Sequence, residues 1–172
     1  MSTLKVNTLI PRTGTTISMG SGATIHNPGS VLQVKEGNLL TGSQFSTTSA
    51  SLADVGLSVQ ITPKFSSSKI LVMFQGFGGA NGSSTALLLQ IQRQIGSGSF
   101  SMITGGGFFY QSNQYESCGL NKLDSPNTTS QLTYKLQGQL SQASGTGYLP
   151  GGWGGDYNTA GYVTLIAMEI AQ

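Results

Sequence analysis

Few residues could carry out acid–base or nucleophilic chemistry, and they lie far apart in the sequence. The 172-residue chain contains one histidine and six acidic residues. His26 lies in a segment with few apolar residues, so a Ser-His-Asp triad would have to be built across that segment. No two acidic residues form a close pair in sequence, although a glycosidase pair could still assemble in space. We therefore expect no catalytic residues and no enzymatic activity.

The acidic residues have structural interpretations that need no ligand. Asp54 stands near the start of a strand, where we expect it to cap a turn, and Glu169 lies in the last apolar run, where we expect it to meet a lysine or lie near a symmetry axis. Asp156 and Asn158 are too few for a calcium site and favour an Asx turn. The run Gly105–Gly107 is not followed by Lys-Ser/Thr at phosphate-loop spacing. We expect no metal and no cofactor.

Aromatic side chains in glycine-rich segments are better candidates for a functional site. They are typical of surfaces that recognise sugars and proteins, because one side chain offers both apolar area and a polar group. An alternative for Trp153 is that it folds back and closes one end of the fold. The candidate receptor or glycan contacts are Tyr110, Tyr115, Tyr148, Trp153 and Tyr157.

Composition excludes several classes of protein. Charged residues are 8% of the chain and the formal net charge is +2, which excludes charge-driven disorder and provides no basic face for nucleic acid. No apolar run reaches the roughly 20 residues of a membrane span, and the first residues do not resemble a signal peptide. The lone Cys118 excludes an intramolecular disulfide framework. We expect a protein made in the cytoplasm and not exported by a standard signal.

The first 29 residues differ from the rest of the chain. Their apolar residues are too sparse to form a core, so we expect residues 1–29 to be a stem or anchoring arm and residues 30–172 to be the head. Pro28-Gly29 is a natural boundary. The arm would interlock with identical copies or lie in a groove on another protein. Its candidate anchoring or inter-subunit residues are Leu4, Val6, Leu9, Ile10, Ile17 and Ile25.

The head shows repeated strand patterns. Apolar residues alternate with polar ones in 55–61 and 131–140, and 69–77 is nearly all apolar, which indicates a central strand. Residues 86–95 fit either a strand or a helix, and their flanking glycine turns favour a strand. Further strands are expected at 31–34, 100–103, 108–110 and 161–170, with an irregular segment at 112–130 and a loop at 141–161. Eight or more short strands predict an all-β fold, a β-sandwich or jelly roll.

The last expected strand, 161–170, has implications for assembly. One face carries Ile166, Met168 and Ile170, and the other carries Leu165 and Ala167. A strand that is apolar on both faces cannot be an exposed edge. We expect it to lie in the centre of a sheet or to be covered on one face by a neighbouring subunit.

Three stretches resemble phage tail-fibre-like and virion appendage proteins of the marine and cyanobacterial phage type. They are the opening STLKVNTLI, the blocks SVLQV and GLSVQITPKFSSSKILV, and the ending GYVTLIAMEIAQ. The resemblance implies a homotrimeric β-sandwich head with a short N-terminal stem, located on a virion. The matching positions are framework positions, so no catalytic or ligand residue carries over.

These expectations lead to two alternative roles. As a short tail fibre or receptor-binding head, the protein would present loops to a host surface glycan or protein. As a capsid decoration, a cement or head-fibre protein, it would be anchored to the shell by residues 1–30. The more distant alternatives are a lectin-like module and a polysaccharide-cleaving enzyme. Low charge suits packing against identical copies, because amides and hydroxyls can both donate and accept across a symmetry axis.

Overall fold

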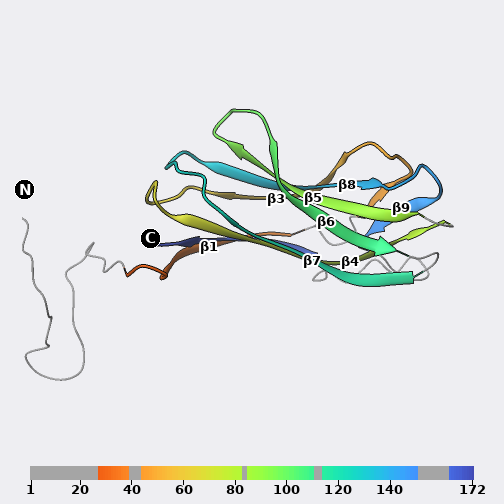
Figure 1. Ribbon diagram of the computed structural model, residues 1–172, viewed down its shortest axis with the longest axis horizontal. Coiled ribbons are helices and arrows are strands. Elements are labelled where there is room, and N and C mark those ends of the chain that lie inside the picture. Colours follow the sequence, from red (N-terminus) through yellow and green to blue (C-terminus); the bar gives the residue numbers. More distant parts are fainter. Residues whose placement is uncertain (1–26, 39–43, 83–84, 111–113, 151–162) are drawn as a thin grey trace, which may run out of the picture.

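The computed structural model describes residues 27–38, 44–82, 85–110, 114–150 and 163–172, which form a two-layer β-sandwich (Figure 1). Sheet A has the order β1-β10-β4-β9-β2, with β7 on the other side of β4, and sheet B has the order β3-β8-β5-β6. The strands are β1 (Val31–Asn38), β2 (Phe45–Thr47), β3 (Ala53–Ile61), β4 (Lys69–Asn81), β5 (Ala86–Ile95), β6 (Ser101–Tyr110), β7 (Gln114–Asp124), β8 (Leu132–Leu140), β9 (Thr146–Leu149) and β10 (Thr164–Ile170).

The core lies between the two sheets and follows from the period of two along each strand. In β8 every second residue is buried, from Leu132 to Leu140, and β3 shows the same alternation. β5 confirms the strand interpretation of 86–95, because Leu87, Leu89 and Ile91 point inward. The predicted all-β sandwich is therefore confirmed. None of the described residues forms a helix long and apolar enough to cross a membrane.

The sequence interpretation was wrong for three segments. The expected loop 141–161 contains a strand, because 146–149 form β9. Residues 112–130 were expected to be irregular, but 114–124 form β7, which pairs along most of β4. Segments 100–103 and 108–110 were expected to be separate strands, but they belong to one strand, β6, with irregular pairing to β5 near Gly105 and Gly106. Gly106 has a φ of +117°, which L side chains rarely adopt, so the glycines bend one strand instead of ending it.

A buried polar network joins the two sheets near the arm end of the sandwich. Arg93 Nη1 on β5 lies 2.8 and 2.9 Å from the two carboxylate oxygens of Asp124 on β7. The Tyr134 hydroxyl on β8 donates to the same carboxylate at 2.8 Å. Burial, together with this hydrogen bond to Asp124, raises the pKa of the Tyr134 hydroxyl far above its usual value. The hydroxyl therefore stays protonated and remains a donor.

At the same end of the sandwich, the Glu169 side chain links β10 to β1 and to the 64–65 backbone. Its carboxylate is buried on the core side of β10 and accepts from Gln33 Nε2 at 2.6 Å and from the backbone amides of Lys64 at 2.7 Å and Phe65 at 3.3 Å. Burial alone would raise the pKa of this carboxyl, but these hydrogen bonds outweigh it and hold the pKa below its usual value. The expected lysine contact is therefore made by the Lys64 backbone instead of its ammonium group.

Asp54 also differs from expectation. It lies within β3 and not at a turn, and its carboxylate pairs with Lys135 Nζ on β8 at 2.5 Å. The β3 pairing with β8 shifts register between Asp54 and Ser58, where Gly56 has a φ of +84°.

The buried carboxylate makes stability depend on pH. In the Glu169→Gln variant, the side-chain NH₂ group would face N–H groups that also donate. We therefore expect the free energy of unfolding at pH 7 to fall by about 1–3 kcal/mol. The folded-state pKa of Glu169 is lowered, so its contribution is complete above the unfolded-state value of about 4.3 and is lost as the pH falls through the folded-state value.

Urea unfolding of the wild type and of Glu169→Gln at pH 7 and at about pH 3 measures this difference. The difference in unfolding free energy between the wild type and Glu169→Gln should be smaller at the lower pH. The exposed substitution Glu116→Gln should change the free energy of unfolding little at either pH. An equal loss of unfolding free energy in Glu169→Gln at both pH values would contradict the role given to the charged carboxylate.

Candidate assembly surface

The side of sheet A that faces away from sheet B is predominantly apolar. The strand pairing fixes the rows of this surface, because residues directly opposite each other share a face. One row runs across four strands through Val34, Met168, Leu71 and Leu123. We define the apolar face of sheet A by its hydrophobic side chains: Val34, Leu71, Met73, Leu123, Ile166, Met168 and Ile170.

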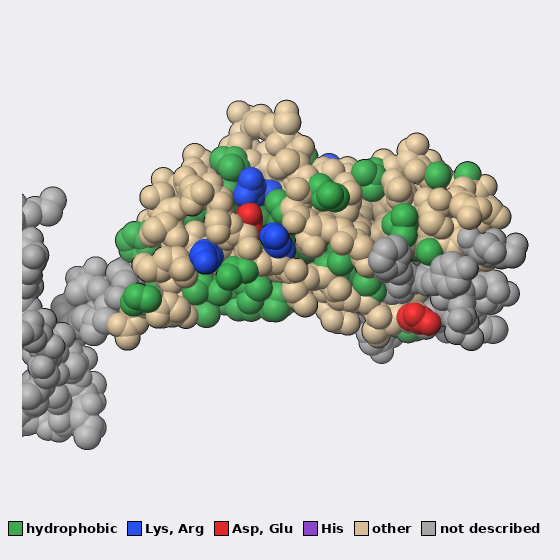
Figure 2. All heavy atoms as spheres, viewed as in Figure 1, with side chains coloured by type: hydrophobic (Ala, Val, Ile, Leu, Met, Phe, Trp, Pro, Cys, Tyr) green, Lys and Arg blue, Asp and Glu red, His purple; other side chains and the backbone are tan. Residues whose placement is uncertain are grey.

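These side chains are not covered within the described part of the chain. Val34 is 53% exposed and Leu123 is 47% exposed, and Met168 and Leu71 between them are half-buried. Figure 2 shows hydrophobic side chains gathered at the lower margin of the sandwich, where Figure 1 places sheet A. A contiguous apolar surface of this kind marks an interaction site in a folded protein.

The apolar face has few charges. In the rows set by the pairing, the charged positions are Glu36, opposite Ile166, and Lys69, opposite Ile170. Polar positions at the far end of the same face are Gln75 and Thr164, which carry no charge. Burying this surface therefore leaves few charges to desolvate.

The sequence identified the β10 part of this face. The expectation that the last strand lies inside a sheet is confirmed, because β10 pairs with β1 on one side and β4 on the other. Its outward residues Ile166, Met168 and Ile170 form the middle of the apolar face. Val34 and Leu123 were missed, because pairing partners cannot be identified from a single sequence and Leu123 was assigned to an irregular segment.

The five aromatic candidates are only partly placed by the described residues. Tyr148 on β9 is half-buried, and its hydroxyl lies 3.5 Å from Asn81 Nδ2. Tyr148 and Tyr115 are both opposite Gly79 of β4, so the backbone brings two of the candidates into one row. Tyr110 ends β6, opposite Ala86. Trp153 and Tyr157 lie outside the described residues, so their proposed role is untested.

The opposite end of the sandwich is where the arm begins. The backbone amide of Gly29 donates to Ala171, and that of Ala171 donates to Ser30, so the start of β1 is held against the end of β10. The six candidate anchoring residues, Leu4 to Ile25, lie outside the described residues, as do His26 and Asp156. Tyr148 and the arm are thus at opposite ends of sheet A.

Within the described residues, no three His, Cys, Asp or Glu side chains come together in a way that could hold a metal ion. Three carboxylates in the described part of the chain, those of Asp54, Asp124 and Glu169, are engaged with protein donors.

Comparisons with known proteins agree with the fold. The sequence matches no family model and no curated protein. The structure of Eiger TNF from S. frugiperda has 8% identity and a TM-score of 0.51, covering 85% of this chain and 95% of that one.

Virus structures also resemble this chain. The infectious bursal disease virus Gt strain has 17% identity and a TM-score of 0.49, covering 91% of this chain. The VP2 subviral particle of the same virus has 17% identity and a TM-score of 0.48, again covering 91%. The chain spans 42% of the length of each of these two viral chains. At 8% identity, the likeness to the Eiger TNF structure shows a shared fold and nothing more specific.

Proposed function

We propose that this chain is a phage virion structural protein, a short tail fibre or receptor-binding head that adheres to the host surface. The resemblance of its opening, its GLSVQITPKFSSSKILV block and its ending to virion appendage proteins supports this role. The β-sandwich fold is compatible with it. The protein acts by assembly and adhesion, without turnover of a substrate.

The observation that carries the proposal is the apolar face of sheet A. A row of hydrophobic side chains crosses four strands and stays exposed on a single chain, which a second copy of the same chain can cover. We propose that three copies pack through this face into a homotrimer. Closed symmetry repeats any charge around the axis, and a face with few charges avoids that repulsion.

The alternative role is a capsid decoration protein anchored by residues 1–30. The two ends of the sandwich differ, because the arm begins at one end of sheet A and Tyr148 lies at the other. This arrangement supports an anchored head in either role. The candidate contact Tyr148 would then face away from the anchor. The position of this chain on the virion distinguishes the two roles.

A charge placed in the middle of the apolar face tests the trimer. Met168 points outward between Val34 and Leu71, so Met168→Lys would bury three ammonium groups at the interface. We expect the wild type to have three times the 17.9 kDa chain mass by light scattering. The variant should dissociate at least about 100-fold more readily, because an unpaired buried charge costs several kcal/mol.

The matched control is Gln92→Lys, which adds the same charge to the outward side of β5 in sheet B and should leave the trimer intact. Circular dichroism checks that both variants are folded. A monomeric wild type, or a Met168→Lys protein that remains trimeric, would overturn this use of the apolar face.

Cryo-electron microscopy of the intact virion tests the role itself. We expect the chain in density on the particle, at the tail or fibre ends for the favoured role and across the capsid surface for the alternative. Incubation of the purified protein with host polysaccharide should release no reducing sugar. Absence of the chain from the particle contradicts a virion role, and sugar release contradicts an adhesive role without turnover.

A further inference from the structure

The outward side of sheet B differs from that of sheet A, because it carries carboxamides in place of hydrophobic residues. Alternate residues of β5 and β8 point away from the core, and five of them are glutamines. Gln94 donates to the Gly98 carbonyl. We define the amide face of sheet B by the other four: Gln90, Gln92, Gln137 and Gln139. A carboxamide offers both donors and an acceptor, so a rigid sheet of them can match hydroxyl groups in either direction.

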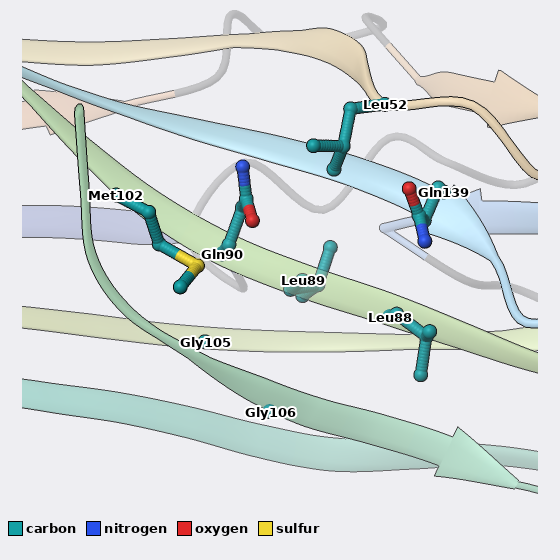
Figure 3. A pocket seen from close by; sticks show the side chains of 8 residues that line it. All are labelled: Leu52, Leu88, Leu89, Gln90, Met102, Gly105, Gly106 and Gln139. Atoms are coloured by element: carbon teal, nitrogen blue, oxygen red, sulfur yellow. The ribbon is translucent and has the colours of Figure 1, made fainter. Parts of the chain in front are cut away.

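A hollow of about 280 Å³ opens at one end of the amide face (Figure 3). Figure 3 shows Gln90 and Gln139 projecting beside the apolar side chains of Leu52, Leu88 and Met102, with Gly105 and Gly106 on the neighbouring strand. Leu52 is 44% and Met102 is 61% exposed, so apolar surface is accessible in the hollow. The hollow therefore combines apolar contact area with carboxamide groups.

Glycine keeps this hollow open. A Cβ atom at Gly105 would lie 3.3 Å from Gln90 Cβ and 3.5 Å from Met102 Sδ, so a side chain at this position would enter the space between two lining residues. Strands place the lining residues more rigidly than loops do, which favours a preorganised site.

A second hollow of about 300 Å³ lies further along the same sheet. Asp54, Ser58, Phe100, Thr133 and Lys135 line it, together with Gly56. Lys135 Nζ lies 4.2 Å from the centre of the Phe100 ring and also pairs with Asp54, so its charge is neutralised within the protein.

One row of side chains connects the two hollows. Gln90 lines the first hollow and Asp54 lines the second, and both are in register with Gln137, which lies between them on β8. Gln90 Nε2 donates to Gln137 Oε1 at 3.3 Å, which orients both amides. Neighbouring strands are about 4.8 Å apart, so the row spans about 10 Å.

This chemistry selects one class of ligand. The first hollow is lined by no charged residue, and the second holds a paired lysine and aspartate, so neither offers a free charge for a phosphate or an acidic sugar. Both hollows are at the small end of the range of ligand pockets, about 300–1,000 Å³. A sugar ring is small and uncharged, and combines hydroxyl groups with apolar C–H faces.

We propose that the amide face of sheet B and its two hollows bind a neutral oligosaccharide of two or three sugar rings. The inference rests on the proposed adhesive function, and it assigns glycan contact to strands of sheet B in addition to the five aromatic candidates. Gln90, Gln137 and Gln139 bond the hydroxyl groups, and Leu88 and Met102 contact a ring face.

The wild-type protein tests the proposal directly. Met102 lines the first hollow, whereas Met73 and Met168 lie on the opposite sheet, so [¹³C]methyl-methionine labelling reports on both surfaces. The probes are neutral trisaccharides of glucose, mannose, galactose and N-acetylglucosamine, with sialyllactose as the charged comparison, each at up to about 10 mM to detect millimolar affinity. We expect the Met102 methyl resonance to shift with at least one neutral probe, and those of Met73 and Met168 to stay unchanged.

Two variants locate the site. Gln139→Leu removes an outward carboxamide from the first hollow and should weaken binding about tenfold, the effect of losing a hydrogen bond to the ligand. Gln94→Leu makes the same change on β5, at a position that lines neither hollow, and should bind like the wild type.

The other outcomes overturn the inference. Equal binding by Gln139→Leu and the wild type, or shifts confined to Met73 and Met168, would place the ligand elsewhere. A Met102 response to sialyllactose alone would contradict a neutral ligand. If no neutral probe shifts Met102 while microscopy finds the chain on the virion, the glycan site is wrong and the virion role stands.

Discussion

Strand β10 is apolar on both sides of sheet A, and a two-layer sandwich can cover only one of those sides by itself. Leu165 and Ala167 are buried against sheet B, so Ile166 and Met168 must point outward beside Leu71. A slip of one residue would exchange the two sets and place Glu169 among outward apolar side chains. The hydrogen bonds that Glu169 accepts from the 64–65 backbone therefore specify which apolar set is inside.

Much of this fold could be predicted from local alternation. Residues 55–61, 86–95 and 131–140 are strands as expected, because their side chains alternate between a buried and an open side. Strand β7 could not be predicted, since 114–124 contains few hydrophobic residues and is held by pairing with β4. Sites that depend on pairing partners, such as the Val34–Leu123 row and the Gln90–Asp54 row, are beyond single-sequence reasoning for the same reason.

The two sheets present different chemistry to their surroundings. Sheet A offers an extended hydrophobic surface, which suits close contact with a surface of similar composition. Sheet B offers carboxamides and two small hollows, which suit a hydrated ligand with hydroxyl groups. The Arg93–Asp124–Tyr134 network joins the sheets, so the two outward surfaces keep a fixed orientation relative to each other.

The pairing order of sheet A also has a kinetic consequence. Strand β1 begins at Val31, yet its partner is β10, at Thr164–Ile170, and β4 needs the same partner. Contacts so distant in sequence form slowly, and during synthesis they must wait for the last strand to leave the ribosome. All four strands of sheet B are made before β10 is. Of the two outward surfaces, the apolar face of sheet A is thus completed after the amide face of sheet B.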